Sequence, residues 1–131
     1  MKRLSKDWLD AAYQDILTIE EIIDNELLTN IVAFHAQQAI EKTFKAVIEE
    51  KCIALPKIHD VIRLYNYIKV YLEFKFDREL LREINEIYID SRYPSEMGLL
   101  PNGSPTVKDA NRFYEFSKFI YDSVQEALES M

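Results

Sequence analysis

The chain has 131 residues, a length typical of one domain that buries a continuous hydrophobic core. Hydrophobic residues make up 48% of it, and only two glycines and four prolines occur, which favours an ordered and mainly helical fold. The net charge of −7 makes nucleic acid an unlikely partner, because binding driven by phosphate contacts requires a cationic face.

Cysteine usage and hydropathy indicate the compartment. Cys52 is the single cysteine, so an intramolecular disulfide is excluded, and no spacing of a zinc site occurs. The first fifteen residues become acidic and polar too quickly for a signal peptide. No apolar run approaches the roughly 20 residues that span a bilayer. We therefore expect a soluble, cytoplasmic protein without a membrane segment.

Two long helices are predicted in the first half of the chain. The first covers about residues 5–25, where apolar side chains recur at three- and four-residue steps, as in Trp8, Ala12 and Ile19. The second covers about residues 29–51, with Thr29 as the expected N-cap. Its apolar face consists of Ala33, Ala36, Ile40, Phe44 and Val47.

Two shorter helices follow a break at Pro56, which lacks a backbone N–H. The third helix is predicted from near residue 59 to residue 71. The fourth begins after Asp77, which has the character of an N-cap, and ends at Pro94.

The last helix is predicted from Thr106 to about Ser130, with Thr106 and Asp109 spaced as a capping box. Its aromatic residues point in most directions around the axis, which is typical of a central helix or of an oligomer interface; they are Phe113, Tyr114, Phe116, Phe119 and Tyr121. The sequence thus predicts a single domain over residues 1–131, an all-α, up-and-down antiparallel bundle of about five helices.

The stretch FHAQQAIEKTFKA, residues 34–46, raises the question of a site. On a helical wheel its polar residues form two rows, Gln37, Glu41 and Lys45 on one side and His35, Gln38 and Lys42 on the other. The wheel alone predicts a solvated face. In it, Glu41 and Lys45 form an exposed ion pair that contributes only about 0.2–0.5 kcal/mol.

Polar residues predicted in other helices could come together with this stretch of the second helix in the folded bundle. Asp15 lies in the apolar stripe of the first helix, where an unpaired carboxylate is costly, so Lys42 or Arg92 is expected to neutralise it. His59 is expected to form hydrogen bonds at the start of the third helix. Tyr88 and Arg92 lie four residues apart and can point the same way, either toward a site or simply closing the end of the bundle.

These residues resemble the HEPN domain family in order and spacing, over the first four helices. The matching motifs are Trp8-x2-Ala11-x3-Asp15, His35-x2-Gln38-x2-Glu41-Lys42-x2-Lys45-Ala46, Pro56-x2-His59-Asp60 and Tyr88-x3-Arg92-Tyr93-Pro94. The resemblance implies a helical bundle that is usually a homodimer and often the partner of a small nucleotidyltransferase in a toxin–antitoxin pair. It also implies that some members bind nucleotides. The positions that carry the motif are Gln38, Lys42, Lys45, His59, Tyr88 and Arg92.

One departure from the family pattern concerns ribonuclease activity. HEPN ribonucleases resemble one another in an arginine followed, after four to six residues, by a histidine, which suits RNA cleavage without a metal. The two histidines here, His35 and His59, lack such an arginine. We therefore do not carry the ribonuclease activity over.

Three functions remain open. The favoured hypothesis is a non-catalytic protein that binds a nucleotide such as ATP or GTP, with or without Mg²⁺, and needs no other cofactor or metal. Lys42, Lys45 and Arg92 would contact phosphate oxygens, and Tyr88 or Tyr93 would stack on the base. Asp15 and Glu41 would serve as structural ion-pair partners. The alternatives are a ribonuclease toxin that uses His35 or His59, and a structural dimeric module joined through the aromatic residues of the last helix.

Overall fold

The described part of the computed structural model comprises residues 1–91 and 105–131, with side chains described for 1–86 and 105–131. Within it the chain forms five α-helices, two short 3₁₀ turns and no strand. The helices are α1 (Arg3–Ile22), α2 (Thr29–Glu50), α3 (Val61–Ile68), α4 (Arg78–Ser91) and α5 (Val107–Glu129), and the turns are η1 (Glu26–Leu28) and η2 (Lys69–Tyr71). The predicted all-α bundle of about five helices is confirmed.

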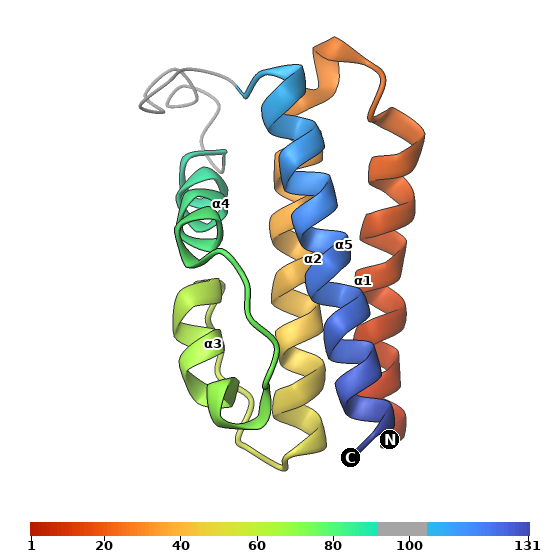
Figure 1. The fold of residues 1–131 in the computed structure, drawn as a ribbon, viewed down its shortest axis with the longest axis vertical. Helices are drawn as coiled ribbons and strands as arrows, with labels where there is room; N and C mark the ends of the chain where they lie inside the picture. The colour runs from red at the N-terminus through yellow and green to blue at the C-terminus, as the bar shows by residue number, and fades with distance from the viewer. Residues whose placement is uncertain (92–104) are drawn as a thin grey trace.

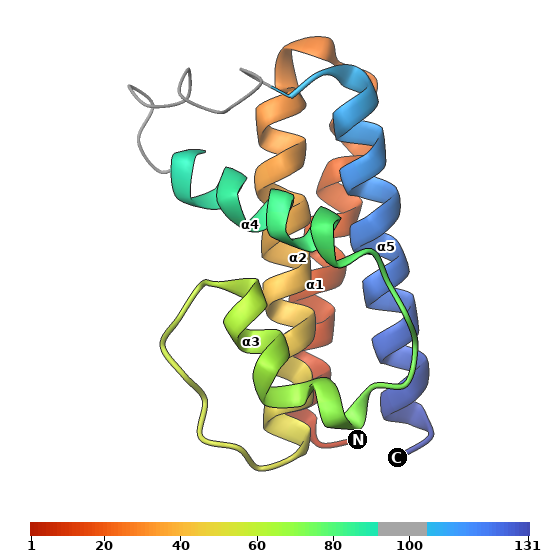
Figure 2. The ribbon, with the colours of Figure 1, turned by 60° about the vertical axis from the view of Figure 1, so that its left-hand side comes forward.

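Helix α2 is the centre of the bundle, because it contacts each of the other four helices. The long helices α1, α2 and α5 lie side by side, and both α2 and α5 run antiparallel to α1 (Figure 1). The shorter α3 and α4 cover a further side of α2 (Figure 2). The sequence suggested that the last helix could be the central one, but the central helix is α2.

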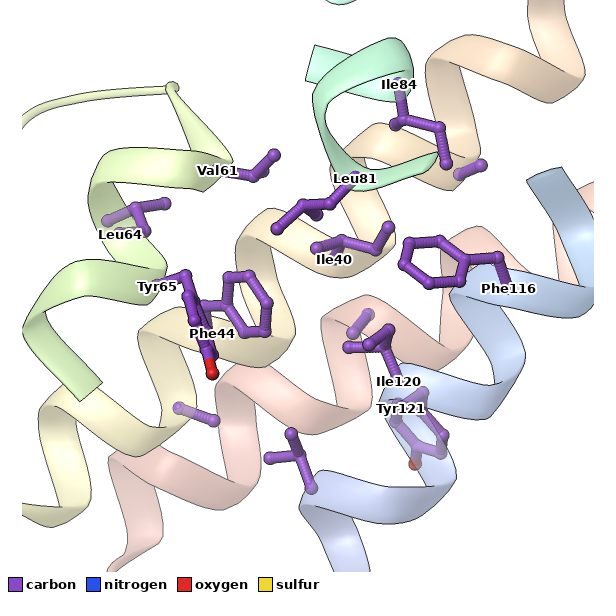
Figure 3. Packing of buried hydrophobic residues seen from close by; sticks show 14 of the residues in the cluster. Ile40, Phe44, Val61, Leu64, Tyr65, Leu81, Ile84, Phe116, Ile120 and Tyr121 are labelled. Atoms are coloured by element: carbon purple, nitrogen blue, oxygen red, sulfur yellow. The ribbon is translucent and has the colours of Figure 1, made fainter. Parts of the chain in front are cut away.

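The hydrophobic core lies where α2 meets the other helices (Figure 3). Ile40 and Phe44 of α2 are fully buried between residues of α3, α4 and α5. Burying a side chain of this size stabilises the fold by about 1.5–3 kcal/mol. Between α1 and α2 the buried residues include Ala12, Ala33 and Ala36, whose small side chains allow these two helices to approach closely.

Two of the predicted helix starts are confirmed by their caps. Asp77 Oδ1 accepts hydrogen bonds from the backbone N–H groups of Glu79 and Leu80, at 3.0 and 3.1 Å. Thr106 and Asp109 form the reciprocal capping box at the start of α5. These caps were predictable because a short polar side chain satisfies backbone donors only a few residues away.

Two other helices begin within two residues of their predicted starts, but their caps differ from the prediction. Thr29 is the first residue inside α2 rather than its cap, because the chain enters through the turn η1, where Asn25 accepts the hydrogen bond from Leu27 N–H. Helix α3 begins after Asp60, whose carboxylate accepts from the N–H groups of the second and third helical residues. His59 therefore precedes the cap, and its side chain is used elsewhere.

The aromatic residues of α5 face different surroundings. Phe113 and Phe116 are buried within this chain, and Phe116 packs near Phe76 with ring centroids 6.1 Å apart. Phe119 is 45% exposed and makes an edge-to-face contact with Phe74. Of the five aromatic residues of α5, Phe119 is the exposed one, and Phe76 in the segment that precedes α4 packs against Phe116.

Candidate functional site

A buried carboxylate on α1 joins the first two helices. Asp15 is 6% exposed, and its Oδ1 lies 2.8 Å from His35 Nδ1 while its Oδ2 accepts a hydrogen bond from Lys42 Nζ at 2.9 Å. We call these three residues the Asp15 cluster. Of the two cations that the sequence offered to Asp15, Lys42 is the one in contact, and the side chain of Arg92 lies outside the described residues.

A second buried carboxylate lies on α2 itself. Glu41 is 4% exposed and accepts a hydrogen bond from Lys45 Nζ at 3.0 Å. His59 Nδ1 lies 3.1 and 3.2 Å from its two oxygens. The Lys45 ammonium also lies 5.3 Å from the centre of the Trp8 ring of α1, within the range of a cation–π interaction. These residues form the Glu41 cluster.

Two glutamines connect the Glu41 cluster with the segment before α3. Gln37 is fully buried, and its Nε2 donates to the backbone carbonyl of His59 at 2.9 Å and to Glu41 Oε1 at 3.3 Å. Gln38 Nε2 donates in turn to Gln37 Oε1 at 2.7 Å. We call the polar residues of the two clusters, together with Gln37 and Gln38, the α2 seam. Its hydrogen bonds to His59 hold the segment before α3 against the middle of α2.

The burial of this seam corrects the helical-wheel prediction. Gln37, Glu41 and Lys45 were expected on a solvated face, yet all three are buried, so Glu41 and Lys45 are not an exposed ion pair. The reason is that Trp8 of α1 and the segment carrying His59 cover this side of α2. The other predicted row is partly exposed, with 25% of the His35 side chain and 27% of the Lys42 side chain accessible.

The seam consequently has two layers. Asp15, Gln37, Glu41 and Lys45 form a buried layer, while His35, Gln38, Lys42 and His59 reach the surface. The two carboxylates and the two ammonium groups balance in formal charge. Lys45 is enclosed by Glu41 and Trp8, which leaves Lys42 as the ammonium group that a ligand can reach.

Of the seven predicted nucleotide-binding residues, four have described side chains: Gln38, Lys42, Lys45 and His59. The side chains of Tyr88, Arg92 and Tyr93 lie outside the described residues. Within the part that is described, no group of three His, Cys, Asp or Glu residues has the arrangement of a metal site.

Sequence reasoning missed the parts played by Gln37 and His35. Gln37 was treated as one more solvated residue, although its position four residues before Glu41 is a spacing that permits contact. His35 was placed on the solvated face and weighed as a catalytic residue, whereas it pairs with Asp15, twenty positions away in the sequence. The sequence shows that His35 occupies a motif position, but it does not show that Asp15 is the partner of His35.

Comparison with known proteins decides the family. The HEPN domain model matches residues 5–127, nearly the whole chain. The chain belongs to the HEPN domain family. A solved crystal structure of an archaeal HEPN homologue aligns with a TM-score of 0.66 at 17% identity, covering 98% of this chain and 99% of that one. At that identity the similarity to the archaeal homologue supports the fold alone. No curated protein matches this HEPN chain.

Within the described residues, this HEPN domain has no helix that is both long enough and apolar enough to cross a membrane.

Proposed function

We propose that this HEPN-domain protein is non-catalytic and binds a nucleotide through the exposed layer of its α2 seam. The observation that carries the proposal is that Lys42, Gln38 and His59 each reach the surface while a buried polar partner holds them. Donors fixed in this way lose little conformational freedom when they bind a ligand, which is how a supporting layer improves a binding site.

The chemistry of the exposed layer suits a phosphate group. An ammonium group has three N–H donors, and Asp15 occupies one donor of Lys42, so two remain for phosphate oxygens. His59 and Gln38 add further hydrogen-bonding groups along the same side of α2. Because the carboxylates beneath offset the positive charge of the two lysines, we expect modest affinity that falls with added salt.

Family membership supports a wider role for the protein. We infer that it acts in the cytoplasm as a homodimer and as the partner of a minimal nucleotidyltransferase in a toxin–antitoxin type of system. The support is the family resemblance of the motifs.

Calorimetric titration with ATP and GTP, each with and without Mg²⁺, tests nucleotide binding. We expect Lys42→Ala to weaken the affinity at least about tenfold, since it removes a charge-assisted contact to phosphate. Lys118→Ala is the matched control, because Lys118 is an exposed lysine of α5 whose partner is Asp122. Absence of binding heat in all four titrations would overturn the proposal.

Loss of binding in Lys42→Ala has to be separated from unfolding, because Asp15 would lose one of its partners. Circular dichroism and the melting temperature of each variant provide this check. Gln38→Ala is a second probe that removes an exposed donor without uncovering a buried charge. Full binding in both folded variants would exclude the seam as the nucleotide site.

A second candidate function, RNA cleavage, is favoured by one specific observation. Each histidine has its Nδ1 within 3.2 Å of a buried carboxylate, an arrangement that orients an imidazole for proton transfer. The test is incubation with structured and unstructured RNA, in parallel with His35→Ala and His59→Ala. Cleavage that survives both substitutions, or no cleavage at all, would eliminate this candidate.

A further inference from the structure

A groove distinct from the α2 seam lies where the chain passes from α3 to α4. Turn η2, the segment of residues 72–77 and the start of α4 enclose a volume of about 490 Å³. Figure 2 shows this connecting segment running from the lower end of α3 up to the start of α4. The volume lies within the range of about 300–1,000 Å³ that small-molecule sites occupy.

Aromatic side chains form one wall of the groove. Tyr65 of α3 is 7% exposed, and its ring meets Phe76 edge-to-face with centroids 5.0 Å apart. Phe74 lies next, 5.9 Å from Phe76 between ring centroids. Figure 3 shows that Tyr65 also lies beside Phe44 of the core, so this wall is anchored in the hydrophobic interior.

Three cations line the same groove. Arg78 lies over the Tyr65 ring at 5.3 Å, and one of its guanidinium nitrogens donates to the Tyr65 hydroxyl at 3.4 Å. Lys69 and Lys75 are exposed beside it. Within the described residues none of the three forms an ion pair, whereas Lys42 and Lys45 of the α2 seam each contact a carboxylate.

One carboxylate, that of Glu73, lines the groove together with the three cations. Asp77 lies next to Arg78, but its carboxylate accepts the first N–H groups of α4. The groove therefore carries a local excess of positive charge on a chain with a net charge of −7. Such a concentration of unpaired cations over an aromatic wall is the chemistry of a site for an anion attached to a ring.

We propose that this groove binds a small molecule with a phosphate or carboxylate group attached to an aromatic or apolar ring. Arg78 binds the anionic group with its planar guanidinium, and Lys75 and Lys69 contribute charge. The ring of the ligand packs against Phe74 and Phe76. The proposal is independent of the α2 seam, since no residue of the seam lines the groove.

Phenyl phosphate is the probe, compared with phenylacetate and with inorganic phosphate. Amide resonances are followed by two-dimensional NMR during titration of the full chain. We expect phenyl phosphate, phenylacetate or both to shift resonances of residues 69–78, with inorganic phosphate binding more weakly by on the order of tenfold because it lacks the ring. The relative affinity of the first two probes identifies the anionic group.

Charge variants of exposed residues make the test specific. Arg78→Gln should weaken binding by on the order of tenfold, and Glu73→Gln should strengthen it, because the carboxylate repels the ligand. Arg82→Gln is the matched control, since Arg82 is an exposed arginine one turn further along α4 that pairs with Glu79. Lys75→Gln serves as the second variant if Arg78→Gln lowers the melting temperature.

Three results would overturn the proposal: no shift at residues 69–78 at millimolar probe, equal binding of inorganic phosphate, or full binding by folded Arg78→Gln and Lys75→Gln. The Lys42→Ala variant separates this proposal from the nucleotide proposal. Lys42→Ala should lose nucleotide binding at the α2 seam but keep phenyl phosphate binding at the groove. The two binding sites can therefore fail or succeed independently in these experiments.

Discussion

The residues that distinguish this helical bundle are two buried carboxylates, Asp15 and Glu41. Each is compensated by a lysine and a histidine, and the pairs connect α1, α2 and the start of α3. Burial of an ion pair contributes little net stability, because desolvation offsets the attraction between the charges. Removing one partner is different, since the remaining charge stays buried without compensation.

We predict from this that Lys45→Met strongly destabilises the fold. Glu41 would retain only the neutral amide of Gln37 and His59, whose side chain is 54% exposed, so the free energy of unfolding should fall by about 3 kcal/mol. The measurement is equilibrium unfolding in urea. The double variant Glu41→Leu, Lys45→Met removes both charges and should lose less than Lys45→Met alone.

Lys118→Met is the control for this prediction, because the Lys118–Asp122 pair is exposed and should contribute less than about 0.5 kcal/mol. A loss in Lys45→Met no larger than that of the control would contradict the prediction. It would mean that the Glu41 cluster is accessible to water in solution.

At the scale of the element, helix ends are fixed by short-range hydrogen bonds. The capping box of α5 satisfies backbone donors at both of its residues, since Thr106 N–H donates to Asp109 Oδ2 and Asp109 N–H donates to Thr106 Oγ1, each at 3.0 Å. The Thr106 N–H, with help from Arg112, holds the pKa of Asp109 below its ordinary value of 3.8. The ionised form of Asp109 is therefore the form that the fold prefers.

The second prediction concerns the pH dependence of this cap. Because the pKa of Asp109 is lower in the folded state, its contribution is fully present above pH 3.8 and is lost as the pH falls through the folded-state value. Asp109→Asn should therefore lower the free energy of unfolding by about 0.5–1 kcal/mol at pH 7, and by progressively less below pH 3.8. Urea unfolding of the wild type and of Asp109→Asn, at pH 7 and near pH 3, measures the loss in the free energy of unfolding at each pH.

Asp122→Asn, at an exposed carboxylate in the same helix, is the matched control and should have a small effect at both pH values. If the loss in Asp109→Asn were equally large near pH 3, the carboxylate charge would have no part in the cap.

The C-terminal end of α2 is terminated in a different way. Cys52 lies in the left-handed region with φ of 57°. Its N–H donates to the Glu49 carbonyl, and the N–H of Ile53 donates to the Ile48 carbonyl, both at 3.1 Å. This is the Schellman pattern of helix termination, in which the left-handed position usually holds glycine. A cysteine at that position is conformationally strained.

We predict that Cys52→Gly is more stable than Cys52→Ala by about 1 kcal/mol, because glycine adopts positive φ without a Cβ clash. Comparing two variants that both lack the thiol removes the effect of its contact with the Lys2 ammonium. Thermal unfolding of both variants provides the measurement. Equal melting temperatures would show that the end of α2 relaxes to another conformation.

The assembly of the whole molecule leads to the last prediction. Phe119 is exposed on α5, whereas Phe116 is buried in the same chain, so of these two residues Phe119 is the one available to contact a second copy. We expect the protein to sediment at twice the monomer mass and Phe119→Asp to shift it toward monomer without lowering helicity. Analytical ultracentrifugation at two concentrations tests this.

A monodisperse monomer at high concentration would exclude the homodimer. A dimer that Phe119→Asp leaves intact would place the interface elsewhere than at Phe119. Phe116→Ala is no substitute as a probe, since it would create a cavity in the core.

The motifs of the sequence resembled the HEPN family, and the family model confirms this. The sequence by itself also determined the helices and the caps at Asp77 and at Thr106 with Asp109. These features depend on apolar spacing and on hydrogen bonds within a few residues, so they can be read locally. The Schellman end at Cys52 is local too, but the chain has no glycine there to indicate it.

Only the tertiary structure decided which polar residues are buried. The wheel of α2 gives the Gln37–Glu41–Lys45 row the same polarity as the His35–Gln38–Lys42 row, yet the first is covered by Trp8 and by the segment at His59. The unpaired cations at Arg78 and Lys75 likewise gather around a groove that no local pattern predicts. The physical reason is that periodicity fixes which way a side chain points, while distant elements fix what lies in front of it.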